Sequence, residues 1–190
     1  MNITVNTELG AVNRILFSIG ASPVNSLSET SVDVVGARTQ LSYASARVQS
    51  RGWTFNIQEN LFVPSDAFSR QIIWRPNWLR VTTSGGQTPY MNKGGLLYDR
   101  ISRTNLFPNG VTVDIVEEQP FDELPFCFQA YIAAKAAKAF NAGAFGDPGT
   151  AAEIEQEIAE AWFMCQEYEL DSGDYGIFED SFVQGRLARR

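Results

Sequence analysis

The side chains of this chain that could do chemistry are mainly carboxylates, because the sequence contains no histidine. Without histidine, neither a Ser-His-Asp nor a Cys-His nucleophile can form, and the commonest nitrogen ligand of metal ions is missing. Glu153, Glu157 and Glu160 recur at helical spacing and share one face of a predicted helix. Such a face could bind a divalent cation or supply an acid and a base. A solvated acidic face is the favoured interpretation.

A second group of carboxylates lies in a stretch that is predicted to form strands. A glycan hydrolase needs two carboxylates that face each other across a cleft, about 5–10 Å apart. The residues nearest to this requirement are Asp99, Asp114, Glu117 and Glu118. A carboxylate-dependent glycan hydrolase is therefore the alternative to a structural protein, which is the favoured class.

Two glycine motifs and two cysteines predict structure rather than chemistry. Ser84-Gly85-Gly86 and Lys93-Gly94-Gly95 lack the longer glycine pattern and the following helix of a phosphate loop, so we expect hairpin turns. Cys127 and Cys165 have no basic neighbour in the sequence, which favours buried, inert thiols. We therefore assign no catalytic residue, no cofactor and no metal ion.

The charge and hydropathy of the chain argue against several classes of partner. The net charge is −7 and the isoelectric point is near 4.6, so wrapping around nucleic acid is disfavoured. Residues 150–180 contain ten acidic side chains and no basic one, whereas residues 186–190 contain three arginines. No apolar run approaches the roughly 20 residues that span a bilayer, and the first residues lack the features of a signal peptide. We expect a soluble protein made in a reducing cytosol, without a membrane partner.

The elements that would position these side chains follow the order two helices, a block of strands, two helices. Helices are predicted over residues 8–20, 31–51, about 125–143 and 151–168, the first capped by Thr7. Strands are predicted at residues 53–58, 61–63, 71–74, 78–83, 90–92, 96–98 and 111–115. The residues expected in the helical core are Leu9, Leu16, Leu41, Val48, Ile154 and Ile158.

This order predicts an α+β fold. A four-helix bundle-like body would be interrupted by a small antiparallel β insertion and followed by an extended C-terminal tail. The expected domains are a helical body of residues 1–52 and 119–171, an inserted β domain of residues 53–118, and a docking tail of residues 172–190. Neither pair of helices can bury a full core alone, so we expect all four to pack together.

Aromatic side chains are abundant in the predicted β insertion and in the tail. A small insertion has limited interior, so we expect some of these side chains to contact a neighbouring subunit. The last arginines are expected to pair with an acidic surface. The candidate subunit or partner contacts are Phe62, Phe68, Trp74, Trp78, Tyr175, Phe178, Phe182, Arg186 and Arg189.

Several strings of residues, spread in order over nearly the whole chain, resemble one known family. They are residues 8–20, Ser50-Arg51-Gly52-Trp53-Thr54-Phe55-Asn56, Asn92-Lys93-Gly94-Gly95-Leu96-Leu97-Tyr98-Asp99-Arg100, Glu123-Leu124-Pro125 and Glu167-Tyr168-Glu169. The chain resembles the tail tubular protein A family, the head-to-tail adaptors or gatekeepers of autographivirus-type podoviruses. No single string is decisive, and their order and spacing make the resemblance specific.

The resemblance implies a structural subunit of a bacteriophage tail rather than an enzyme, although glycan hydrolysis has been proposed for some members. It implies a dodecameric adaptor ring that joins the portal protein to the tail nozzle protein, tail tubular protein B. The ring would line the DNA channel, support attachment of the tail fibre protein and be assembled in the cytoplasm of the bacterial host. Genomic DNA would pass without specific binding, and Glu153, Glu157 and Glu160 are then candidates for an acidic channel face.

Overall fold

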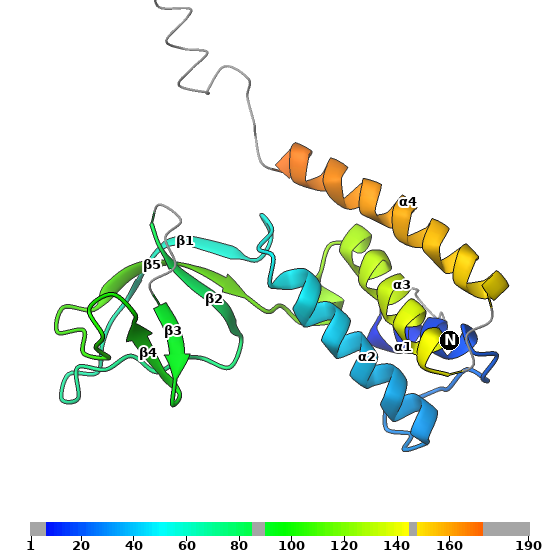
Figure 1. The fold of residues 1–190 in the computed structure, drawn as a ribbon, viewed down its shortest axis with the longest axis horizontal. Helices are drawn as coiled ribbons and strands as arrows, with labels where there is room; N and C mark the ends of the chain where they lie inside the picture. Colours follow the sequence, from blue (N-terminus) through cyan, green and yellow to red (C-terminus); the bar gives the residue numbers. More distant parts are fainter. Residues whose placement is uncertain (1–6, 85–89, 145–147, 173–190) are drawn as a thin grey trace, which may run out of the picture.

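The computed structural model describes residues 7–84, 90–144 and 148–172 of the chain (Figure 1). Within these residues the helices are α1 Glu8–Phe17, α2 Val32–Gln49, α3 Phe126–Gly143 and α4 Pro148–Ser172. Between α2 and α3 lie the strands β1 Ile57–Val63, β2 Trp78–Thr83, β3 Tyr90–Lys93, β4 Leu96–Asp99 and β5 Val111–Glu117, with a short 3-10 helix, Phe121–Glu123, before α3. The predicted α+β fold, a helical body with an antiparallel β insertion, is confirmed.

Local signals in the sequence place the ends of the helices. The hydroxyl of Thr7 accepts a hydrogen bond from the backbone N–H of Gly10 at 3.1 Å, and α1 begins directly after it. The hydroxyl of Ser31 does the same for Val34 at 3.4 Å at the start of α2. The last helix is longer than predicted, because α4 begins at Pro148, which suits a first helical turn.

The core of the helical body surrounds α3, which contacts each of the other three helices. Phe128, Ile132, Ala136 and Ala137 of α3 are fully buried in this core. Of the residues predicted for the core, Leu16, Leu41, Val48 and Ile154 are buried, and Ile158 is partly buried against them.

The prediction that Leu9 belongs to the core is wrong. Leu9 is only half-buried, and the buried face of α1 is formed by Ala11, Val12, Ile15 and Leu16. The helix is rotated so that small and branched side chains, rather than Leu9, face α3.

The segment that follows α2 was predicted to start a strand at Trp53, and this prediction is wrong. The strand β1 begins at Ile57, and Trp53 and Phe55 instead pack their rings on Phe128, with centroid distances of 4.8 and 4.7 Å. The indole N–H of Trp53 also donates to the carbonyl oxygen of Val48 at 2.8 Å. The alternation of apolar and polar residues here therefore reflects packing on the helices, not pairing in a sheet.

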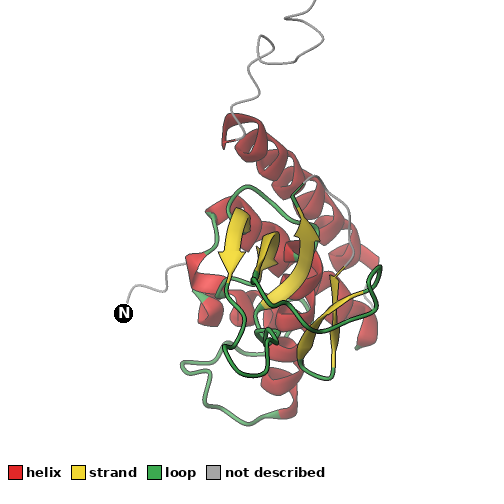
Figure 2. Cartoon of the chain, turned by 90° about the vertical axis from the view of Figure 1, so that its left-hand side faces the viewer, coloured by secondary structure: helices red, strands yellow, loops and turns green. Residues whose placement is uncertain are grey.

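The β region consists of two antiparallel pieces (Figure 2). One is a three-stranded sheet in the order β1-β5-β2, and the other is the hairpin β3-β4, whose turn at Gly94 and Gly95 was predicted. The β region has an apolar cluster of its own, which includes Val81, Val113 and Ile115. A regular strand at residues 71–74 is not formed, since Ile73 makes only an isolated bridge with Leu96.

A buried cluster of amides joins the helical body to the β region. The side-chain amide of Asn56 donates to the carbonyl oxygens of Gln49 and Glu117, at 3.1 and 2.9 Å. The side chain of Gln49 exchanges two hydrogen bonds with the backbone of Gln119, at 3.0 and 2.8 Å. We call these four residues the amide joint. They link the last turn of α2 to the start of β1 and to the end of β5, which are the two places where the chain enters and leaves the β region. The predicted domain boundaries stay a prediction.

Candidate assembly surfaces

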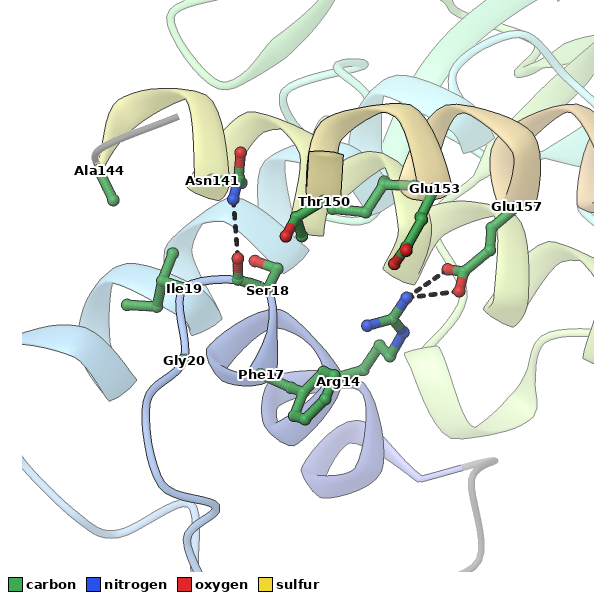
Figure 3. A pocket seen from close by; sticks show the side chains of 11 residues that line it. Arg14, Phe17, Ser18, Ile19, Gly20, Asn141, Ala144, Thr150, Glu153 and Glu157 are labelled. Carbon is green, nitrogen blue, oxygen red and sulfur yellow. Dashed lines mark hydrogen bonds and ion pairs between the residues drawn. The ribbon is translucent and has the colours of Figure 1, made fainter. Parts of the chain in front are cut away.

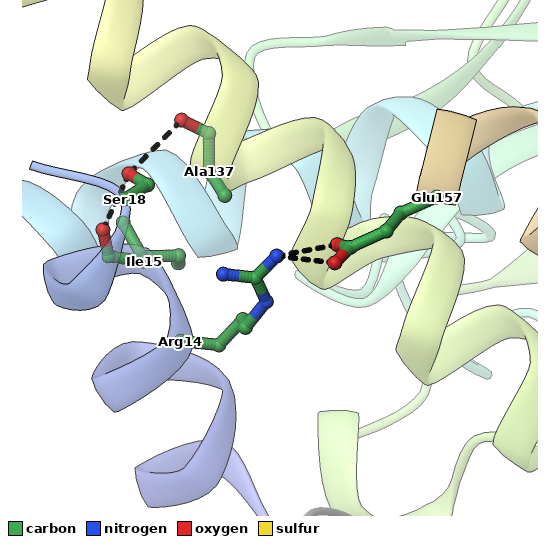
Figure 4. A network of polar contacts seen from close by, with 5 residues as sticks. All are labelled: Arg14, Ile15, Ser18, Ala137 and Glu157. Atoms are coloured by element: carbon green, nitrogen blue, oxygen red, sulfur yellow. Dashed lines mark hydrogen bonds and ion pairs between the residues drawn. The ribbon is translucent and has the colours of Figure 1, made fainter. Parts of the chain in front are cut away.

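The predicted acidic face lies on α4, where Glu153, Glu157 and Glu160 are all exposed. The three carboxylates differ in their partners. Glu157 accepts two hydrogen bonds from the Arg14 guanidinium of α1, at 2.5 and 2.6 Å (Figure 4). Among the described residues, Glu160 accepts from the amide of Gln156 at 2.8 Å, one turn earlier. The ion pair reduces the negative charge at Glu157, so most of the acidity of this face comes from Glu153 and Glu160.

A pocket of about 800 Å³ lies where the end of α1 meets the end of α3 and the start of α4 (Figure 3). Arg14, Glu153 and Glu157 line one side of it, and Ser18 and Asn141 line the other. The Asn141 amide donates to the Ser18 carbonyl oxygen at 2.7 Å, and the Ser18 hydroxyl donates to the carbonyl oxygen of Ile15 at 2.6 Å. Most of these polar groups therefore tie helix ends together, which is a structural task.

Each of the four carboxylates considered for a hydrolase has different surroundings in the described residues. The two oxygens of Glu117 accept from the Trp78 indole and from the Gln58 amide, both at 2.9 Å. Asp114 accepts from the backbone N–H of Asn60 at 2.9 Å. Glu118 lines a separate pocket with Glu8 and α2 residues. Two of these carboxylates thus stabilise strands and loops of the β region.

Asp99, the remaining carboxylate of that set, holds a turn. It accepts hydrogen bonds from the backbone N–H groups of Ile101 and Ser102, at 2.7 and 3.1 Å. Partial burial raises the pKa of Asp99, but the hydrogen bonds from Ser102 and Ile101 outweigh this effect and keep that pKa below its ordinary value. A general acid needs a raised pKa, so this carboxylate is unsuited to that role.

The aromatic candidates of the β region fall into two groups. Phe62 and Phe68 are exposed, and Phe68 is 97% exposed. Trp78 is only 4% exposed, and its ring packs edge-on against half-buried Trp74, with the centroids 5.9 Å apart. The expectation that Trp78 contacts a partner is therefore corrected, because the strand turns this side chain into the interior of the β region.

The candidates in the tail, Tyr175, Phe178, Phe182, Arg186 and Arg189, lie outside the described residues. Their predicted contacts stay a prediction.

Exposed apolar side chains also occur at places that the sequence analysis did not single out. Val32, Val35 and Tyr43 form a stripe along the outer face of α2, and Phe163 and Leu170 lie one behind the other on α4. The sequence pattern could have revealed them, because apolar residues occupy two faces of these helices. A helix on the surface of a monomer needs only one apolar face, the one that packs on the core. Such surfaces indicate contacts with other chains.

The sequence itself identifies the family. The family model described as "Tail tubular protein" matches residues 9–175. The chain belongs to the tail tubular protein family. Tail tubular protein A of Klebsiella phage KP34 is 29% identical over 118 residues, which are 62% of this chain and 62% of the relative. The matched stretch thus spans less than two thirds of that relative's length.

Membership in the tail tubular protein family makes the chain a structural subunit of a bacteriophage tail, and therefore a part of the virion. Two structural findings concern the described residues of this tail tubular protein. In the part of the chain that the structure describes, no helix is long and apolar enough to cross a membrane. Among the same residues no group of three or more Cys, Asp or Glu side chains is placed to hold a metal ion.

The two cysteines of this tail tubular protein are buried between α3 and α4, as predicted. Burial raises the pKa of the Cys127 thiol, and burial together with the neighbouring Cys127 raises that of Cys165. Both side chains are therefore neutral thiols near pH 7 that fill the core and react slowly.

Proposed function

We propose that this tail tubular protein forms a dodecameric adaptor ring that joins the portal protein to the tail nozzle protein. One observation supports the proposal above others: large exposed apolar side chains lie on several separate sides of the subunit, on α2, on α4 and on the loops of the β region. A subunit of a closed ring needs two different faces for its two neighbours, and further faces for the partners above and below.

The acidic face of α4 lines the DNA channel in this proposal. No Lys or Arg lies between Pro148 and Ser172, so the unpaired carboxylates of this helix repel phosphates. DNA that crosses such a surface is not held by the counterion release that makes basic proteins bind it. Repulsion keeps the channel open for the genome, and the exposed carboxylates of Glu153 and Glu160 contribute most.

The tail fibre protein attaches near the junction of ring and nozzle, and the ring is assembled in the cytoplasm of the bacterial host. The segment of residues 172–190 serves as a docking tail through its aromatic and arginine side chains. Catalysis has no part in this role. Of the carboxylates that a glycan hydrolase would need, Asp114 and Glu117 already bind strands and loops, and Asp99 holds a turn.

The proposal is tested by measuring the mass of the full chain in solution, alone and with the portal protein of the same phage. Analytical ultracentrifugation gives the mass, and electron microscopy of the mixture gives the number of subunits around the axis. A ring, formed either alone or only on the portal, is the expected result. A chain that stays monomeric beside the portal and is not found at the head-tail junction of virions would contradict it.

A further inference from the structure

Two loops of the β region repeat the same sequence pattern and the same hydrogen bonds. Residues 66–70 are Asp-Ala-Phe-Ser-Arg and residues 99–103 are Asp-Arg-Ile-Ser-Arg. In each loop the first carboxylate accepts from the backbone N–H groups two and three residues later, at 3.1 and 2.8 Å in the first loop and at 2.7 and 3.1 Å in the second. The closing arginine has a positive φ in both, 55° and 54°.

The two loops lie together and form one surface, which we call the twin-turn tip. The backbone N–H of Phe107, just after the second loop, donates to the carbonyl oxygen of Arg70 at 2.7 Å. Figure 1 shows both loops at the end of the β region that points away from the helices. A left-handed conformation is strained for arginine, and a structure retains such strain mainly where the resulting geometry has a use.

The twin-turn tip presents apolar side chains surrounded by positive charge. Phe68 is 97% exposed and Ile101 is 73% exposed, each at the third position of its turn. The guanidinium groups of Arg70, Arg100 and Arg103 are exposed as well, and none forms an ion pair with a residue that the structure describes. The nearby carboxylates are occupied by the N–H groups of their own turns.

The second half of α4 presents the complementary surface. Phe163 is 61% exposed and Leu170 is 66% exposed, and they follow each other two turns apart on one face. Glu167 and Asp171 are exposed beside them. The C-terminal end of a helix also carries a partial negative charge that attracts arginine. The last turns of α4 extend beyond the N-terminal end of α3, so this face is open to another molecule (Figures 1 and 2).

We propose that the twin-turn tip of one chain docks on the second half of α4 in a neighbouring copy of the same chain. The inference rests on the proposed ring, and it names the contact that builds it. Apolar side chains meet apolar side chains, and arginines meet carboxylates. The two surfaces belong to opposite parts of one chain, so each copy offers both and the contact repeats head to tail, as a closed ring requires. The first half of α4 stays free for the channel.

A disulfide between copies tests the contact directly. Ala67→Cys places a thiol beside Phe68, and Gln166→Cys places one beside Phe163; both positions are exposed, and both apolar anchors are kept. Rings of the full-length double variant on the portal protein are checked by electron microscopy, oxidised and run on a denaturing gel without reductant. We expect a ladder of cross-linked chains. Ala67→Cys combined with Ser42→Cys on α2 is the control, and should give none.

The outcomes separate this contact from the ring itself. Rings of the double variant that give no ladder overturn the docking contact and leave the proposed function standing. A ladder that is equally strong in the control pair also overturns it, because the thiols then meet by collision. If the unmodified chain forms no ring with the portal protein, the proposed function fails and the contact fails with it.

Charge reversal gives a second, independent measurement. Arg100→Glu with Arg103→Glu is expected to raise the chain concentration needed for half-maximal ring formation about fivefold or more. A change of about fivefold corresponds to the upper end of the contribution that exposed ion pairs make to binding. Glu167→Arg with Asp171→Arg should act likewise, and the combination of all four should recover most of the loss. Arg47→Glu on α2 is the control. An unchanged concentration in the first variant, or no recovery in the combination, overturns the contact.

Discussion

At the scale of single residues, the most consequential side chains are neutral amides in the amide joint. Asn56 uses both ends of its side chain, because its oxygen also accepts from the backbone N–H of Trp53 at 2.8 Å. Gln49 is fully buried, and its amide donates to the Ser45 hydroxyl at 2.9 Å as well. Buried backbone groups at this point therefore depend on two side chains for their hydrogen bonds.

Asn56→Ala is expected to lower the free energy of unfolding by about 3 kcal/mol, because it removes the hydrogen bond to the N–H of Trp53 and those to the carbonyl groups of Gln49 and Glu117. Urea denaturation followed by tryptophan fluorescence measures the loss. Gln166→Ala, at an exposed position of α4, is the control and should change the free energy by less than about 0.5 kcal/mol. Equal effects of the two substitutions would show that the amide joint is not important for stability.

Asp66 and Asp99 make the stability of the twin-turn tip depend on pH. Hydrogen bonds from the backbone and the side chain of Ser69, and then from Phe68, lower the pKa of Asp66, and the pKa of Asp99 is lowered too. A lowered folded-state pKa stabilises the fold at a pH above the unfolded value, near 4, and this stabilisation is lost as the pH falls through the folded-state value.

Asp66→Ala combined with Asp99→Ala should therefore be less stable than the unmodified chain at pH 6, and the difference should shrink at pH 2.5. Urea unfolding at the two pH values measures it. A difference that is the same at both values would mean that the carboxylates do not hold the turns as anions. Glu59→Ala, at an exposed position of β1 outside the two turns, is a suitable control.

At the scale of elements, the order of helices and strands and most helix ends were predictable from the sequence. Thr7, Ser31 and the glycines of the β3-β4 turn act locally, so their effect is visible without the fold. The position of Trp53 was not predictable, because the same alternation suits a strand and a loop packed on Phe128. The twin-turn tip was also missed, since two separate loops become one surface only in three dimensions.

Gly52 shows how one backbone position connects two elements, α2 and β1. Its φ is 83°, and a β-carbon there would lie 2.7 Å from the guanidinium of Arg80 and 3.1 Å from Val116. Gly20 after α1 has a similar φ of 72°, but a β-carbon there would meet nothing within 4 Å. Substitutions at the two glycines therefore separate the loss of stability that comes from backbone strain from the loss that comes from crowding.

Gly52→Ala should lower the free energy of unfolding by about 2 kcal/mol or more, because strain and crowding add. Gly20→Ala should cost only the strain, about 1 kcal/mol. Thermal unfolding of both variants beside the unmodified chain measures the two effects. Equal costs would mean that Arg80 moves aside freely and that the chain at Gly52 is not tightly packed.

At the scale of the whole molecule, a helical body and a β region stand end to end, and α4 runs along the outside of the helical body (Figure 1). The acidic residues gather on α4, whereas the arginines of the twin-turn tip lie at the other end. In a ring, this separation lets one end of each subunit face its neighbour while the acidic half-helix faces the DNA. The sequence indicated the acidic run, but its pairing with Arg14 of α1 needed the packed helices.

Glu153→Lys with Glu160→Lys is expected to slow genome ejection several-fold, because lysines in the channel would bind phosphates that now pass without adhesion. Ejection from virions that contain the variant is followed by the fluorescence of a dye that binds released DNA. Glu59→Lys on β1, away from the acidic face, is the control with half the change of charge. Unchanged ejection kinetics at low salt would count against a channel position for this face.

The amide joint consists of side-chain amides and backbone groups, and its hydrogen bonds involve no ionised atom. Acid, alkali and added salt act on ionised groups and leave such bonds nearly unchanged. A virus particle meets all three between one host and the next. The angle between the helical body and the β region within each subunit should therefore change little between dilute water, brine and mild acid, even where charged contacts between subunits weaken.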